Sequence, residues 1–160
     1  MTRPRPKGKR GELEVVQLWR QAGWTGAFRT PNSGGLRPFG AGDLSPWPGD
    51  IGGIKPWLCE VKYDERVKAP SRGWTGEAFI RRTLKDLDHL AIRHSFIVGA
   101  TRPRPVLFAR GSFEFWRVFV PEHELRPWIG DDFHGFVEPV YVELTPPMFF
   151  ELAHELEPVP

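Results

Sequence analysis

The chain has 160 residues, of which 40% are hydrophobic and 26% are charged, a composition typical of one soluble globular domain with a real core. A single cysteine, Cys59, excludes an internal disulfide framework and a cysteine-rich zinc site, and no apolar stretch approaches the roughly 18 residues of a membrane span. The net charge is +2, but residues 1–130 hold all 22 Lys and Arg and only 13 of the 20 acidic residues. We therefore expect a protein of the reducing cytoplasm, with no signal peptide, no membrane contact and a basic N-terminal part.

The first part of the chain predicts an arm followed by a helix. Residues 1–9 are rich in proline and charge, so we expect a disordered basic arm. Residues 11–22 place apolar side chains at helical spacing. This spacing predicts an amphipathic helix that turns Leu13, Val16 and Trp19 toward the core.

Short strands and a long loop are expected next. Residues 25–30 predict a short strand that turns Phe28 inward and Arg29 to the opposite face. Residues 31–49 are crowded with Gly and Pro, which predicts a loop with little regular structure. Residues 50–63 predict a short strand, a turn and a longer strand that form a hairpin-like pair.

The rest of the chain predicts, after a polar loop, a helix, three strands and a terminal helix, at residues 78–94, 95–100, 105–110, 113–121 and 145–157. Thr145 is the expected N-cap of the last helix. The order of helix, strands, helix and strands predicts an α/β fold, with a mixed central β-sheet flanked by helices. We see no repeat and no second domain, so residues 1–160 are expected to form one domain.

Two charged residues interrupt the longest predicted strand. Glu60 and Lys62 alternate with Cys59 and Val61, and side chains two residues apart on a strand point the same way. Glu60 and Lys62 therefore share one face. Two interpretations are open: a structural ion pair, or half of a metal-dependent active site.

Asp50, at the start of the preceding predicted strand, supports the interpretation as part of a metal-dependent active site. If the two strands pair through a short turn, Asp50 and Glu60 reach the same end of the sheet. Two carboxylates and the backbone carbonyl of Val61 are hard oxygen ligands that suit Mg²⁺, with Mn²⁺ as a substitute. Such an ion can generate hydroxide and neutralise charge during phosphodiester hydrolysis. Lys62 beside it would orient the attacking water or stabilise the developing charge.

The spacing of Asp50 in "PGDI" and of Glu60 and Lys62 in "EVK" resembles the PD-(D/E)xK nuclease superfamily. The upstream stretch "KGKRGELEVVQLWRQAGWTGAFRTPNSGG" is similar to the opening of the archaeal-type Holliday junction resolvases. The resemblance covers about the first 100 residues, and residues 101–160 match no part of the family. It implies a single nuclease domain with a restriction-endonuclease-like core.

The resemblance also implies a function and further site residues. It implies an endonuclease that resolves four-way DNA junctions by metal-dependent hydrolysis, as a homodimer in the cytoplasm of a prokaryote or of a phage host. In the family's order of motifs, the helix carboxylate falls on Glu12, which completes or orients the metal site. The phosphate-positioning residues fall on Arg29 and Ser33. Asp43 remains open as a rival to Asp50 for the metal-ligand role.

Further contacts to DNA are expected from the basic arm and from the polar loop after residue 63, through Lys7, Lys9, Arg10, Arg66, Lys68 and Arg72. Trp74 in that loop is a candidate for contact with nucleic acid. We also expect the acidic C-terminal segment to build the dimer contact, with Phe149, Phe150 and Leu152 as apolar anchors. Two other functions stay open: another PD-(D/E)xK repair or restriction-type nuclease, and a basic DNA-binding protein without catalysis.

Overall fold

The computed structural model describes residues 7–30, 49–68, 76–98, 102–125 and 140–156. Three α-helices, six strands and two short 3₁₀ helices follow in the order α1 (Lys7–Gln21), β1 (Phe28–Arg29), β2 (Ile51–Gly52), β3 (Trp57–Tyr63), η1 (Glu65–Val67), α2 (Gly76–Val98), β4 (Arg104–Arg110), β5 (Arg117–Pro121), η2 (Glu122–Leu125), β6 (Tyr141–Leu144) and α3 (Pro146–Leu156). None of the helices in these ranges is both long and apolar enough to span a membrane.

The strands form one mixed sheet in which spatial order equals chain order, from β1 to β6. All neighbouring strands are antiparallel except β3 and β4, which are parallel. A parallel pair needs a long crossover, and α2 provides it. The predicted α/β fold with a mixed central sheet and flanking helices is therefore confirmed.

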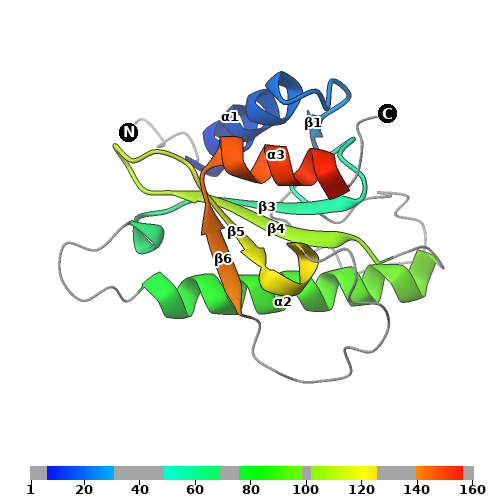
Figure 1. The fold of residues 1–160 in the computed structure, drawn as a ribbon. Coiled ribbons are helices and arrows are strands. Elements are labelled where there is room, and N and C mark those ends of the chain that lie inside the picture. The colour runs from blue at the N-terminus through cyan, green and yellow to red at the C-terminus, as the bar shows by residue number, and fades with distance from the viewer. Residues whose placement is uncertain (1–6, 31–48, 69–75, 99–101, 126–139, 157–160) are drawn as a thin grey trace, which may run out of the picture.

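The helices cover both faces of the sheet. Figure 1 shows α1 and α3 on one face and α2 on the other. Side chains alternate along β3, so Trp57, Cys59 and Val61 enter the core below α1 and α3, while Leu58 packs with buried residues of α2. Glu60 lies on the same face as Leu58, toward the end of the strand where apolar cover gives way to partial exposure.

Aromatic rings fill the core below α1 and α3. Trp19 of α1 is fully buried, and its ring centroid lies 5.6 Å from that of Phe149 and 5.1 Å from that of Phe150. Thr145 caps α3 as predicted, since the Met148 backbone amide donates to its hydroxyl at 3.4 Å. Phe149 and Phe150 therefore belong to the core of this chain, and the prediction that they anchor a dimer is wrong.

Several element boundaries differ from the predictions. Helix α1 begins at Lys7, so residues 7–9 are helical and are not part of a disordered arm. Helix α2 continues to Val98 and absorbs most of the predicted strand at residues 95–100, because the crossover must run the length of the sheet before β4 can begin. The predicted strand at residues 113–121 begins only at Arg117. Strand β6 has no counterpart among the predictions.

Two predicted core side chains are exposed. Leu13 is 49% exposed, and Val15 takes the inward position on α1 instead. Phe28 is 47% exposed because its ring lies over Gly52 of the paired strand instead of entering the core. A Cβ added to Gly52 would lie only 2.4 Å from this ring. The neighbouring Gly53 has a φ of +74°, which favours glycine in the turn that leads to β3.

We expect Phe149→Ala to lower the free energy of unfolding by about 3–5 kcal/mol, because it empties a fully buried ring site between the sheet and α1. Urea denaturation measures this change. Met148→Ala, at a side chain 52% exposed on the same helix, is the control and should stay within about 0.5 kcal/mol of wild type. If Phe149→Ala instead kept the stability of wild type but lost an oligomer that wild type forms, Phe149 would be a dimer anchor after all.

Candidate active site

Asp50 lies immediately before β2 and is held on three sides by backbone. Its amide donates to the Cys59 carbonyl at 2.9 Å, and its own carbonyl accepts from the Thr30 amide at 3.0 Å. Its carboxylate Oδ2 accepts from the Val61 amide at 2.8 Å. The carboxylate thus bonds to β3 just before backbone pairing with β2 begins at Ile51, and Asp50 is only 7% exposed.

The same geometry orients the backbone carbonyl of Val61. In a strand, the amide and carbonyl of one residue point to the same side, and residues two apart share that side. Since Cys59 bonds to Asp50 and the Val61 amide bonds to its carboxylate, the Val61 carbonyl also points to the side of β3 from which Asp50 approaches, just before β2 begins. The Val61 carbonyl and the Asp50 carboxylate therefore lie on the same side of β3.

Glu60 and Lys62 form an ion pair on the face of β3 that α2 covers. Lys62 Nζ lies 2.8 Å from Glu60 Oε1, and the side chains are 35% and 24% exposed, respectively. Burial acts to lower the pKa of Lys62, but the charge and hydrogen bond of Glu60 and the charge of Asp50 outweigh it and raise the pKa. Lys62 therefore stays a cation near neutral pH, which suits charge stabilisation or water orientation.

Glu12 approaches from the opposite face of the sheet, on α1. It is buried and forms an ion pair with Arg29 of β1. Glu12 is the sixth residue of its helix, and the first turn holds no acidic residue, so a role at the helix dipole is excluded. Glu14 lies on another side of α1, where it accepts from the Trp116 indole at 3.1 Å. The structure thus separates two acids that are close in sequence.

The carboxylates converge electrostatically on Asp50. Burial raises the pKa of Asp50 to about 8, and the charges of Glu60 and Glu12 act in the same direction. The Val61 hydrogen bond and the charge of Lys62 oppose this rise without cancelling it. Glu60 of β3 and Glu12 of α1 are thus both near enough to Asp50 to disfavour its charged form.

This donor set fits a hard divalent cation. Asp50 and Glu60 offer carboxylate oxygens, Val61 offers a carbonyl, and Glu12 stands behind them with Arg29. A cation among these groups would stabilise the ionised form of Asp50, which burial and its acidic neighbours destabilise. The predicted residues therefore suit Mg²⁺ or Mn²⁺ in chemistry, but within the described ranges Glu12, Asp50 and Glu60 are not among the acids and histidines whose ligand atoms come within 4.8 Å of one another in threes.

The predicted DNA contacts are only partly within the described ranges. Lys9 and Arg10 lie on the first turns of α1, and Arg10 Nε also bonds to Glu14 at 3.1 Å. Arg66 is exposed in η1 and bonds to Asp64 at 2.6 Å, and Lys68 follows it on the surface. Lys7 begins α1 as well, whereas four other candidates lie outside the described residues: Ser33, Asp43, Arg72 and Trp74.

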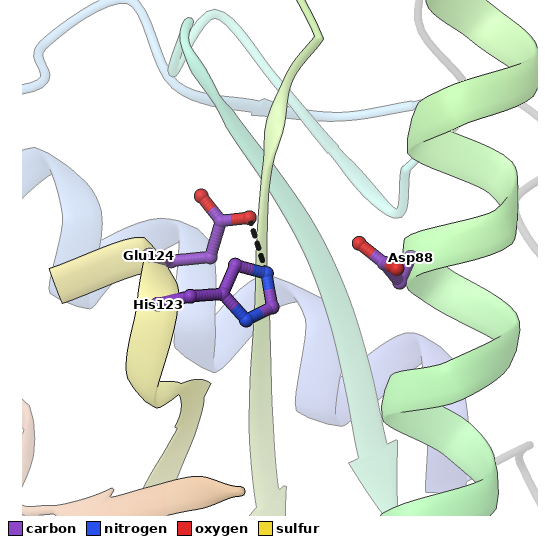
Figure 2. Close-up of side chains that lie close together, drawn as sticks. All are labelled: Asp88, His123 and Glu124. Atoms are coloured by element: carbon purple, nitrogen blue, oxygen red, sulfur yellow. Dashed lines mark ion pairs between the residues drawn. The ribbon is translucent and has the colours of Figure 1, made fainter. Parts of the chain in front are cut away.

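A second group of potential metal ligands lies elsewhere and was not predicted. Asp88 of α2 faces His123 and Glu124 of η2, and one ligand atom from each lies within 4.8 Å of the others. Figure 2 shows the three side chains, with His123 between the two carboxylates. Sequence spacing could not reveal this group, because Asp88 comes from a distant helix. The adjacent pair His123 and Glu124 was the only local signal.

Arg102 already pairs with both carboxylates of this second group. Its Nη1 donates to Asp88 Oδ1 at 2.8 Å, and its Nη2 forms an ion pair with Glu124. Burial acts to raise the pKa of Glu124, but the hydrogen bond of His123 and the charge of Arg102 outweigh it, so the pKa is lowered. A divalent cation would have to displace the guanidinium. The group is therefore better explained as an ion-pair cluster that ties η2 to α2.

Comparison with protein-family models, with curated proteins and with solved structures finds no match to this chain.

We expect Asp50→Asn to change how stability depends on pH in the absence of divalent ions. A pKa raised from 3.8 to about 8 on folding stabilises the fold below pH 4, and this contribution is lost as pH rises to about 8. The variant lacks this loss, so its melting temperature should rise relative to wild type between pH 5 and 8. Through this one group, the free energy of unfolding of wild type can fall by at most about 1.4 kcal/mol per pH unit.

The same melting experiment in Mg²⁺ provides the control. At pH 8, Mg²⁺ should stabilise wild type, because binding to the folded state shifts the unfolding equilibrium, and it should not stabilise Asp50→Asn. A difference between the two proteins that does not vary with pH would show that Asp50 ionises normally. In that case Asp50 would have no raised pKa, and the electrostatic evidence for a metal site around it would be lost.

Proposed function

We propose that this chain is a metal-dependent DNA endonuclease of the PD-(D/E)xK type. The observation that carries the proposal is that two further acids and a lysine, from α1 and β3, act on the charge of Asp50. Asp50 is bonded to the backbone of β3, and the charges of Glu12, Glu60 and Lys62 all act on its pKa. These are the residues that the motif singles out, and their spacing along the chain does not require them to meet.

The order of elements supports a restriction-endonuclease-like core. A helix is followed by three antiparallel strands, a crossover helix and a strand parallel to the third. In this arrangement β3 is internal, so its end can receive groups from both faces of the sheet. Glu12 comes from the α1 face, and Glu60 and Lys62 lie on the α2 face.

Each residue then has a distinct role in phosphodiester hydrolysis. Asp50 and Glu60, with the Val61 carbonyl, hold Mg²⁺ or Mn²⁺, which when bound supplies charge neutralisation and a nucleophilic water. Glu12 orients this set and holds Arg29 in place. Lys62 remains protonated, so it orients water or stabilises charge on the phosphate but does not accept a proton.

The substrate and the active assembly follow from the resemblance to the resolvases. A four-way junction is the proposed substrate, and a homodimer is the proposed active form, because two symmetric nicks need two sites related by a two-fold axis. Recognition would depend mainly on phosphates and on DNA shape, so binding should weaken steeply with salt.

We expect wild type to cleave a four-way junction in Mg²⁺ and to lose this activity in EDTA. Glu60→Gln keeps the size of the side chain but removes a charged ligand, so it should reduce cleavage by roughly 100-fold or more. Asp88→Asn is the matched control, since it removes a carboxylate from the second group of potential ligands, and it should stay within about twofold of wild type. Gel assays with labelled junction and linear duplex measure all three proteins.

The outcomes separate the open functions. Cleavage of linear duplex as fast as of a junction would favour a different repair or restriction-type nuclease. Binding of DNA without any Mg²⁺-dependent cleavage would favour a non-catalytic DNA-binding protein. A larger loss in Asp88→Asn than in Glu60→Gln would move the metal site to the second group.

A further inference from the structure

The turn between β4 and β5 presents two phenylalanine rings to solvent. Phe113 and Phe115 are 103% and 93% exposed, the highest values among the large apolar side chains of the described ranges. Single exposed apolar residues are common, but two rings gathered at the tip of one turn form a small interaction surface. We refer to residues 111–116 as the aromatic turn.

The backbone of the aromatic turn does not favour phenylalanine. The Glu114 amide donates to the Gly111 carbonyl at 3.4 Å, which closes a four-residue turn. Phe113 is its third residue and has a φ of 63°, a left-handed conformation that glycine adopts readily and bulky residues rarely do. The exposed ring makes no packing contact that would offset this strain. Neither folding nor backbone geometry therefore accounts for an aromatic residue here.

Specific bonds hold the aromatic turn in place. A carboxylate oxygen of Glu65 in η1 accepts from the Ser112 amide at 3.1 Å and also from the Ser112 hydroxyl. Arg110 Nη1 donates to the Glu114 carbonyl at 3.0 Å. The two rings are thus presented on a fixed support, which lowers the entropy lost when they contact a partner.

The aromatic turn lies beside the candidate active site. Strand β4 pairs with β3 so that Ala109 lies opposite Lys62 and Arg110 opposite Tyr63, and the turn follows directly. Trp116, at the end of the turn, packs against Gly11 of α1. A Cβ added to Gly11 would lie only 3.2 Å from the Trp116 ring. Figure 1 shows this turn protruding from the sheet on the side where α1 begins.

Basic groups flank the rings. Lys68 lies against the turn: a Cβ added to Gly111 would lie 3.1 Å from the Cβ of Lys68. The Arg110 guanidinium lies 4.4 Å from the centroid of the Tyr63 ring. The neighbouring acid Glu65 is engaged by Ser112. Arg110 is also paired with Glu14 at 3.2 Å, and Glu114 stands between the two phenylalanines, so Lys68 is the basic group left to contact a phosphate while the two exposed rings suit the faces of bases.

We propose that Phe113 and Phe115 stack on unpaired or unstacked bases at the branch point of a DNA substrate. This inference rests on the proposed nuclease function, which places DNA at the adjacent end of β3. The rings would hold the branch open while Lys68 contacts the backbone. They would contribute selectivity for branched over linear DNA, because paired bases in a continuous duplex leave no exposed ring faces.

The test uses a four-way junction with 2-aminopurine at the branch point, bound by the full chain in EDTA so that no cleavage occurs. Wild type should change the 2-aminopurine fluorescence, and Phe113→Ala/Phe115→Ala should abolish that change. The double variant should bind the junction about tenfold more weakly, while its affinity for linear duplex stays within about twofold of wild type. Phe96→Ala, at an 83% exposed ring on α2, is the matched control and should behave as wild type.

A second variant guards against loss of structure. Phe113→Gly suits the positive φ of the turn, so it should melt no lower than wild type and still bind the junction more weakly. Wild-type binding and fluorescence in the double variant would overturn the proposal. A change from dimer to monomer by light scattering in that variant would also overturn it, because the rings would then contact a second copy of the chain.

The failure of this inference and of the proposed function can be told apart. If wild type cleaves the junction and the ring variants match it in cleavage, binding and fluorescence, only the stacking role fails. If wild type binds and alters the fluorescence but never cleaves in Mg²⁺, only the nuclease fails. If wild type binds no DNA, both fail.

Discussion

The hydrogen bond from the Val61 amide to the Asp50 carboxylate holds an ionisable group inside the sheet at the point where β2 begins. Burial of that carboxylate next to Glu60 and Glu12 raises its pKa to about 8, so ionisation at neutral pH is unfavourable without compensation. The charge of Lys62 and the Val61 hydrogen bond supply part of it. A divalent cation would supply the rest, which is why this arrangement is suited to metal-dependent chemistry.

The fold delivers these groups from opposite sides of one strand. The aromatic core around Trp19 fixes α1 and α3 on the sheet, and α1 then brings Glu12 to the edge that β2 leaves open. The parallel pairing of β3 with β4, through α2, covers the other face up to Leu58 and leaves Glu60 partly exposed. The competing acids around Arg102 are internally neutralised, so they have less need of a metal.

Much of the fold could be predicted from local sequence, and so could the strand that carries Glu60 and Lys62. Helical spacing located α1, α2 and α3, and the alternation around Glu60 located β3, because both signals arise within a few residues. The sequence misjudged features that depend on distant partners. The length of α2 is set by the span of the sheet. Phe28 is exposed because its ring lies over Gly52 of the paired strand. Phe149 is buried because it packs against Trp19. The ion cluster at η2 likewise involves residues far apart in the chain.

The most direct test of the central claim is anomalous diffraction from crystals grown with Mn²⁺. We expect a manganese peak bound by the carboxylates of Asp50 and Glu60, and no such peak in crystals of Asp50→Asn. A manganese peak at Asp88, His123 and Glu124 alone, or a wild-type crystal with none near Asp50, would contradict it.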